Sequence, residues 1–218
     1  MYEQTRPSAS SEVESLQEVP AEEASPRSSR SGGTLPDGTT REEVAELVAQ
    51  AERGSREAFA TLVRLYQDRL FGFLLKYTRH PQDAEDLCQE TFLRAYKSLN
   101  AYRPVWAFST WLFTIARHTA LNHLRARRPV EELSEDTESL TAADRPAETV
   151  AGREDARRLW AVARRLKPPF YEALRLRYGE GLSLPEVARV MNTNQVRVRV
   201  LLHRARKQMA GMLSRNPL

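Results

Sequence analysis

Cysteine is nearly absent from this chain of 218 residues, which contains only Cys88. A single thiol excludes an internal disulfide and any zinc site built from several cysteines. The four histidines also lack acidic or histidine partners four residues away, the spacing that zinc-binding helices use. We therefore expect Cys88 to be a small buried apolar residue, and we assign no residue to a metal or a cofactor.

Long apolar segments are absent as well. No run approaches the about 20 apolar residues that span a bilayer, and no N-terminal segment joins a basic start to an apolar core, as a secretion signal does. The sequence therefore predicts a cytoplasmic protein without membrane insertion. It contains no glycine-rich phosphate loop, no nucleophile elbow and no convincing pair of catalytic carboxylates, so it also predicts a protein that is not an enzyme.

Two stretches have too few apolar residues to form a core. Residues 1–39 are rich in Ser, Glu, Pro and Gly, so we expect an extension that stays disordered because apolar burial cannot offset chain entropy. Residues 130–150 combine many acidic residues with a single arginine and Pro146, which is typical of a flexible acidic linker. Fully extended, such a linker reaches roughly 65 Å at about 3.3 Å per residue.

Helical periodicity of apolar residues marks the two remaining segments, 40–129 and 151–216. Thr40–Glu43 and Ser183–Glu186 have the pattern of a capping box, which begins a helix. The expected fold is all-α: a four-helix domain joined by the linker to a domain that ends in a helix-turn-helix. The expected helices begin after Thr40 and Ser55 and span 83–99 and 108–127 in the first domain, and span 154–166, 168–178, 184–191 and 195–213 in the second.

Charge is distributed unevenly, although the formal net charge is only +4. Acidic residues concentrate in the N-terminal extension and in 131–148, and basic residues in 117–128 and 157–207. Such basic segments indicate a protein that binds a polyanion. Aromatic residues just before the basic helix, including Trp106, suit stacking on single-stranded bases, but the spacing of Phe108 and Trp111 also fits rings that pack in the core.

Two helical faces are candidates for binding. On the helix expected at 83–99, Asp86, Gln89, Glu90 and Leu93 lie opposite the apolar stripe, and this face is either solvated or covered by a partner protein. On the last helix, arginine can bind guanine in the major groove or neutralise phosphate, and the alternative is a solvated basic helix in an ordinary helical hairpin. Its candidate DNA-facing residues are Gln195, Arg197, Arg199, His203 and Arg206.

These segments together resemble bacterial sigma factors. Residues 83–96 (DAEDLCQETFLRAY) resemble the acidic core-binding helix of that family, and 108–112 (FSTWL) with 115–117 (IAR) resemble the adjoining promoter-opening region. Residues 202–207 (LHRARK) resemble the end of the last domain. Because a short linker replaces the middle domain of housekeeping sigma factors, the chain is similar to the extracytoplasmic-function (ECF) subfamily.

The resemblance implies a subunit that directs RNA polymerase to promoters and is held inactive by an anti-sigma factor. The first domain would bind the clamp helices of the largest polymerase subunit and capture an unpaired base of the minus-ten element. The second would read the minus-thirty-five duplex while resting on the flap of the second-largest subunit. The implied residues are Asp86, Gln89, Glu90 and Leu93 for the polymerase, Trp106, Arg117, Asn122, Arg125 and Arg128 for minus-ten DNA, and Gln195, Val196, Arg197, Arg199, Val200, His203 and Arg206 for minus-thirty-five DNA.

The chain departs from the family pattern at two places. Many members have GTVKSR at the start of the recognition helix, where this chain has VRVRVL at 196–201. Val196 and Val200 would then face the groove, where they can contact thymine methyl groups. Thr114 and Ile115 also replace the tryptophan pair of housekeeping sigma factors, which implies weaker, more promoter-dependent melting.

Two alternatives to a sigma factor stay open at this point. A stand-alone helix-turn-helix regulator would bind DNA by itself, but it leaves the acidic helix unexplained. A sigma-like mimic that only sequesters an anti-sigma factor should lack a basic recognition helix, and Arg197, Arg199 and Arg206 argue against that.

Overall fold

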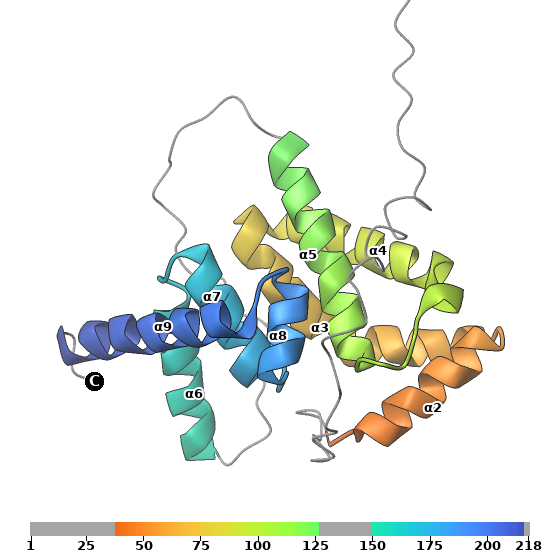
Figure 1. Cartoon of the computed structure of the whole chain (residues 1–218), viewed down its shortest axis with the longest axis horizontal. Helices are drawn as coiled ribbons and strands as arrows, with labels where there is room; N and C mark the ends of the chain where they lie inside the picture. Colours follow the sequence, from red (N-terminus) through yellow and green to blue (C-terminus); the bar gives the residue numbers. More distant parts are fainter. Residues whose placement is uncertain (1–37, 127–149, 216–218) are drawn as a thin grey trace, which may run out of the picture.

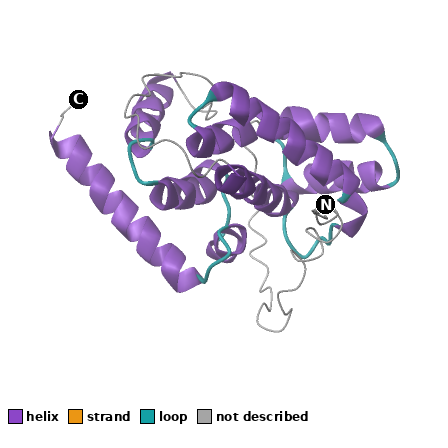
Figure 2. Cartoon of the chain, turned by 90° about the horizontal axis from the view of Figure 1, so that it is seen from above, coloured by secondary structure: helices purple, strands orange, loops and turns teal. Residues whose placement is uncertain are grey.

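The computed structural model describes residues 38–126 and 150–215, which form helices joined by short loops (Figure 2). Most of the expected N-terminal disordered segment, the acidic linker and Arg128 lie outside the described residues. No strand occurs in the two described ranges, and the all-α expectation is confirmed. None of the described helices has the length and apolar character needed to cross a membrane.

Ten helical elements make up the described parts (Figure 1). Those of the first domain are α2 (Arg41–Glu52), α3 (Arg56–Thr78), α4 (Pro81–Lys97), the short 3-10 helix η2 (Leu99–Ala101) and α5 (Phe108–Ala126). Those of the second domain are α6 (Val150–Ala163), α7 (Pro168–Leu174), the π-helical η3 (Arg175–Gly179), α8 (Leu184–Val190) and α9 (Gln195–Arg215).

Both predicted capping boxes are confirmed. The Thr40 hydroxyl accepts a hydrogen bond from the Glu43 N–H at 3.2 Å, and the Glu43 carboxylate accepts one from the Thr40 N–H at 2.7 Å. Ser183 and Glu186 repeat this exchange at the start of α8, at 3.4 and 2.7 Å. Each box satisfies backbone donors that have no partner within the helix, and so it sets the residue at which the helix begins.

Some helix boundaries differ from the predicted ones. α4 begins at Pro81 rather than at 83, because the fixed φ and missing N–H of proline suit the first turn of a helix. α6 begins at Val150 rather than at 154. The helix expected over 168–178 is α-helical only to Leu174 and then continues as a π-helical segment, where the Glu180 N–H reaches the Arg175 carbonyl at 2.9 Å.

α3 is the central helix of the first domain and packs against α2, α4 and α5. Its buried residues recur every three or four positions and so form one side of the helix, as expected for a helix that faces a core on one side. Edge-to-face ring contacts join it to α5, between Tyr66 and Phe108 and between Phe73 and Phe113. The buried residues of α3 are Ala58, Leu62, Tyr66, Leu70, Phe73 and Leu74.

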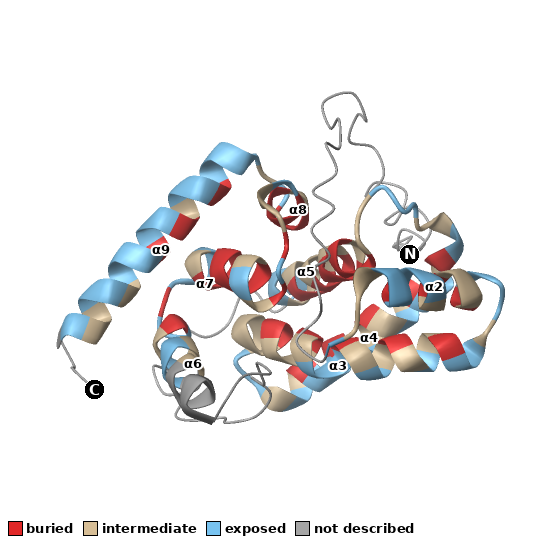
Figure 3. Cartoon of the chain, turned by 90° about the horizontal axis from the view of Figure 1, so that it is seen from below, coloured by how far each residue is buried: buried red, intermediate tan, exposed pale blue. Residues whose placement is uncertain are grey.

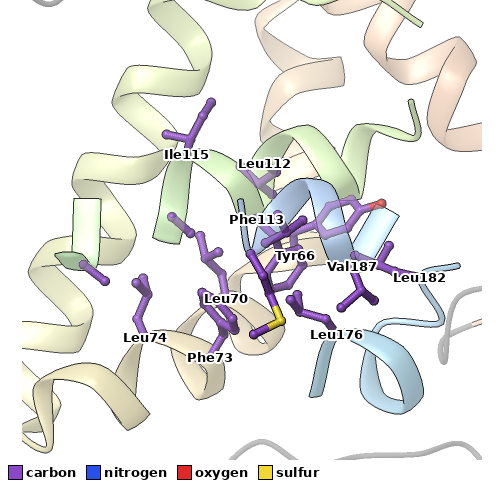
Figure 4. Close-up of a cluster of buried hydrophobic side chains, with 14 of the residues drawn as sticks. Tyr66, Leu70, Phe73, Leu74, Leu112, Phe113, Ile115, Leu176, Leu182 and Val187 are labelled. Atoms are coloured by element: carbon purple, nitrogen blue, oxygen red, sulfur yellow. The ribbon is translucent and has the colours of Figure 1, made fainter. Parts of the chain in front are cut away.

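The apolar core continues from the first domain into the second. Leu176, Leu182 and Val187 of the second domain lie beside Tyr66 and the side chains of α5 (Figure 4). α8 packs against α5, and α7 contacts α3. The two domains therefore share one packed interior, an arrangement that nothing in the sequence pattern indicated.

Cys88 is buried on the core side of α4, as predicted. Burial, with smaller contributions from the charges of Asp68 and Glu85, raises the pKa of the thiol from 9.0 to about 12. We expect native protein at pH 8 to react with a thiolate-directed reagent about a thousandfold more slowly than the unfolded chain, because the thiolate is the reactive form. Time courses of alkylation with and without denaturant check this, and equal rates would contradict the burial of Cys88.

Candidate functional site

The predicted polymerase-binding residues lie on the outer side of α4. The opposite side packs in the core through Ala84, Cys88 and Ala95. Asp86 and Gln89 are exposed, and Leu93 is 59% exposed, although it is a large apolar side chain. Glu90 is half-buried and accepts hydrogen bonds from Arg94 at 2.7 and 3.0 Å. The helix thus presents an apolar side chain among carboxylates and an amide, a surface that suits a protein partner.

Tyr96 extends this surface and was missed in the sequence analysis. It is exposed and lies three residues after Leu93, so the two side chains are neighbours on the helix. Its ring packs on Phe59 of α3 with centroids 4.9 Å apart. Its position one turn beyond Leu93 could have identified it from sequence.

The loop before α5 is held by aromatic packing. The Tyr102 hydroxyl donates a hydrogen bond to the Trp106 carbonyl at 2.8 Å, and burial, together with the charge of Glu52, raises the pKa of Tyr102 to about 12. Trp106 is half-buried. Phe108 is buried and Trp111 half-buried, and their ring centroids lie 5.7 Å apart. Phe108 and Trp111 therefore pack in the core, which is one of the two alternatives predicted from the sequence, rather than standing free to stack on bases.

The predicted minus-ten residues of α5 fall into two groups. Arg125 is exposed near the end of the helix, and its guanidinium lies 3.4 Å from the side-chain oxygen of the half-buried Asn122. Arg117, two turns earlier, points toward the second domain, where its Nε donates a hydrogen bond to the Glu172 carboxylate at 2.6 Å. α5 itself contains no acidic residue, and the carboxylate that pairs with Arg117 lies on α7.

Glu172 is buried beside Arg117 and Tyr77. Burial raises the pKa of the Glu172 carboxyl, while the neighbouring Arg117 guanidinium acts in the opposite direction. Burial, and then the charge of Glu172, raise the pKa of Tyr77 well above its ordinary value. The guanidinium thus compensates a carboxylate that would otherwise be costly to bury.

The helix-turn-helix is formed by α8, the turn at 192–194 and α9. Asn192 adopts a positive φ of 48°, a conformation that asparagine tolerates better than most residues. The Thr193 N–H bonds the Ala188 carbonyl at 2.9 Å. The Asn194 side chain accepts a hydrogen bond from the Arg197 N–H at 2.8 Å, which caps the first turn of α9. Local hydrogen bonds therefore fix the angle at which α9 leaves the turn.

One side of α9 is buried and the opposite side is exposed (Figure 3). Val198, Leu202 and Ala205 are buried against the rest of the domain. No acidic residue occurs between 195 and 215, so the exposed side has a single sign of charge. The predicted minus-thirty-five residues are all exposed: Gln195, Val196, Arg197, Arg199, Val200, His203 and Arg206.

Val196 and Val200 are unusual members of this surface. They are 66% and 43% exposed, and they lie one helical turn apart among arginines. An exposed valine lowers the stability of a helix only slightly relative to alanine. The fold therefore tolerates both valines without gaining packing from them. Their place on the basic side of α9 is the one expected for contacts with thymine methyl groups.

Comparisons with known proteins identify the family to which the two helical domains belong. The family Sigma-70 region 2 matches residues 62–130, and the family Sigma-70, region 4 matches residues 156–209. The RNA polymerase sigma-H factor of Pseudomonas aeruginosa is 34% identical over 178 residues, which cover 77% of this chain and 92% of that protein. The ECF RNA polymerase sigma-E factor of Haemophilus influenzae is 35% identical over 177 residues, which cover 77% and 93%.

Solved structures show the same fold. The structure of CnrH in complex with the cytosolic domain of CnrY has a TM-score of 0.56 and 25% identity, covering 78% of this chain and 97% of CnrH. RpoE in complex with the anti-sigma factor NepR from Bartonella quintana has a TM-score of 0.56 at 19% identity, covering 72% and 98%.

The chain belongs to the sigma-70 family, in its ECF subfamily. Sigma factors are subunits rather than enzymes: they bind core RNA polymerase and promoter DNA, and they direct transcription initiation. The stand-alone regulator and the mimic are thereby set aside as descriptions of the whole chain.

Proposed function

We propose that this sigma factor uses three separate surfaces for its task. The outer side of α4, with Asp86, Gln89, Glu90 and Leu93, binds the clamp helices of the largest polymerase subunit. Trp106 in the loop before α5, together with Arg117, Asn122 and Arg125 of α5, holds the minus-ten element. The exposed side of α9 reads the minus-thirty-five duplex. It does this in the cytoplasm and without catalytic activity of its own.

The observation that carries the proposal is the exposed side of α9. Its seven predicted DNA residues are accessible, and the opposite side of the helix forms the core of a helix-turn-helix. Cations without acidic neighbours suit contacts with phosphate. Arg199 can donate hydrogen bonds to base edges, and the neighbouring Val196 and Val200 can contact thymine methyl groups.

Control by an anti-sigma factor is part of the proposal. The structurally similar CnrH was solved in complex with the cytosolic domain of CnrY. A partner that covers the exposed outer side of α4 would block binding to the polymerase. We propose such a protein as the partner that keeps this chain inactive.

The function is tested by transcription in vitro. Purified core polymerase is given templates selected from genomic fragments, with and without this chain. We expect discrete promoter-directed transcripts only with the chain present. If core polymerase with the chain initiates no better than core polymerase alone on every template, the proposed function is wrong.

Replacing Arg199 by alanine tests the reading of DNA by α9. We expect Arg199→Ala to weaken binding to the preferred minus-thirty-five duplex by about 1–3 kcal/mol and to relax its sequence preference, because a bidentate base contact is lost. Lys207→Ala is the matched control, since this exposed cation suits phosphate contact and its loss should weaken all duplexes alike. Fluorescence anisotropy with cognate and scrambled duplexes measures both, and an equal effect of Arg199→Ala on both duplexes would assign Arg199 to phosphate.

A further inference from the structure

The two exposed valines of α9 occupy the middle of its exposed side. The buried stripe of this helix consists of Val198, Leu202 and Ala205. At about 100° per residue, the midpoint between Val196 and Val200 lies roughly 180° from the centre of that stripe. Among the described residues of α9, these two are the only exposed large apolar side chains. When α9 lies in a groove of DNA, both valines therefore face the floor of the groove.

Arginines lie on both flanks of this pair. Arg199 lies about 60° from Val196 on one flank, and Arg197 lies about 60° from Val200 on the other. An α-helix fills the major groove, which is about 12 Å wide, so its flanks face the two phosphate backbones. Long cationic side chains on the flanks suit phosphates and the base edges next to them, and the floor between them is left to the valines. A second arginine follows on each flank seven residues later, and the four exposed arginines are Arg197, Arg199, Arg204 and Arg206.

Valine can recognise only one group on the floor of the major groove. Its side chain has no hydrogen-bond donor or acceptor, and the apolar group that the bases present there is the methyl group of thymine. Contact with that methyl group removes apolar surface from water on both sides. A valine placed against the amino group of cytosine or adenine would instead take a donor out of water without a partner, which is unfavourable. The two valines therefore favour thymine and disfavour the bases with amino groups.

The methyl groups of both valines are fixed before DNA binds. Valine in a helix occupies one χ1 rotamer about 90% of the time, so binding loses little side-chain entropy. Both valines lie in the first two turns of α9, which begins at Gln195, and the N-terminal residues of a recognition helix are the ones that contact base edges. The Asn194 side chain caps this end through the Arg197 N–H at 2.8 Å. The position of the two side chains is thus defined by the fold.

The spacing of the valines sets the spacing of the bases that they can reach. Val196 and Val200 are about 6 Å apart along the helix axis, and successive base pairs are about 3.4 Å apart. We infer that the minus-thirty-five element of this sigma factor has a thymine at each of two positions one or two base pairs apart, and that Val196 and Val200 recognise these thymines through their methyl groups. This inference rests on the proposed function.

Replacing thymine by deoxyuridine tests the inference, because it deletes the methyl group and leaves the hydrogen-bonding groups of the base unchanged. The probe is a promoter that gives a transcript with this chain and core polymerase, with each thymine of its minus-thirty-five element replaced in turn. We expect the holoenzyme to bind about fourfold more weakly at each of two positions and about 15-fold more weakly when both are replaced, as for the loss of one buried methylene group per position. Deoxyuridine in the spacer is the control and should change the affinity less than about twofold, because phosphate contacts do not depend on the base.

Alanine variants assign each methyl group to one valine. We expect Val196→Ala to remove the sensitivity to deoxyuridine at one position and Val200→Ala to remove it at the other, because the apolar partner of each methyl group is lost. Both variants should keep the fold, since the valines are exposed and alanine favours a helix more than valine does. Leu159→Ala is the matched control, an exposed apolar residue on α6 of the same domain, and it should leave both sensitivities unchanged.

5-Methylcytosine separates methyl contact from recognition by hydrogen bonds. Cytosine presents an amino donor where thymine presents an acceptor. We expect replacement of either T·A pair by C·G to weaken binding by the holoenzyme, and a methyl group on that cytosine to restore about fourfold of the loss. A methylated cytosine that binds no better than cytosine at both positions would overturn the inference.

The inference and the proposed function fail in different ways. If no promoter yields a transcript that depends on the chain, the proposed function is wrong, and the recognition of thymine is wrong with it. If transcripts appear but no thymine of the minus-thirty-five element is more sensitive than the spacer, the function stands and the inference is wrong. Sensitivity that persists when both valines are alanine would also overturn it. A double variant that binds the promoter as tightly as the unaltered chain would assign the valines to a protein partner instead of DNA, which contradicts the inference.

Discussion

Replacing Asp86 by arginine is expected to abolish binding to core polymerase and leave the fold intact. Asp86 is exposed on the outer side of α4, opposite the core, so the charge reversal removes no packing. At a protein interface, truncation of one partner of a desolvated charge pair costs about 2–5 kcal/mol, and a reversed charge adds repulsion. We therefore expect the affinity to fall at least about a hundredfold, measured by titration of labelled chain with core polymerase.

The matched control is Glu85→Arg. Glu85 is exposed on the same helix but lies about 100° away around the helix axis from Asp86. The charge change and the helix are identical, so equal losses for both variants would point to overall electrostatics rather than to a docking face. Unchanged affinity of Asp86→Arg, with normal helicity, would refute the assignment of α4.

Replacing Phe113 by alanine is expected to have the largest effect on stability. Phe113 is fully buried and packs edge-to-face on Phe73 with centroids 5.2 Å apart. It also belongs to the same cluster of buried side chains as Leu176 and Val187 of the second domain (Figure 4). A buried phenylalanine cut back to alanine costs about 3–5 kcal/mol, a large part of the about 5–15 kcal/mol that stabilises a typical domain.

Urea unfolding followed by circular dichroism measures this loss, with Leu93→Ala as the control. Leu93 is also a large apolar residue, but it is 59% exposed, so its truncation should change the free energy of unfolding by less than about 0.5 kcal/mol. The two variants should therefore separate: Phe113→Ala loses stability, and Leu93→Ala keeps stability but weakens polymerase binding. A small effect of Phe113→Ala would contradict the shared core.

Features set by residues close together in the chain could be predicted from sequence. The capping boxes at Thr40 and Ser183 begin helices as expected, because their hydrogen bonds join residues three positions apart. The stripe of α4 and the two sides of α9 follow from helical periodicity alone. The same periodicity predicts that Leu93 and Val196 are exposed, because they lie on the sides of their helices opposite the core.

Features that depend on distant residues could not be predicted in this way. Glu172 and Glu186 have the sequence appearance of surface charges, yet they meet Arg117 and Thr110 at separations of 55 and 76 residues. Nothing in local composition distinguishes a carboxylate with a buried partner from a solvated one. The π-helical turn after Leu174 was missed for a related reason, because one extra residue in a turn leaves the apolar pattern of a helix almost unchanged.

Cryo-electron microscopy of this chain bound to core polymerase and promoter DNA tests the central claim most directly. The account predicts that the side of α4 with Asp86, Gln89 and Leu93 lies against the polymerase clamp, and that the exposed side of α9 lies in the duplex, away from α5. A complex in which that side of α4 faces solvent would contradict the account, whatever the position of the second domain.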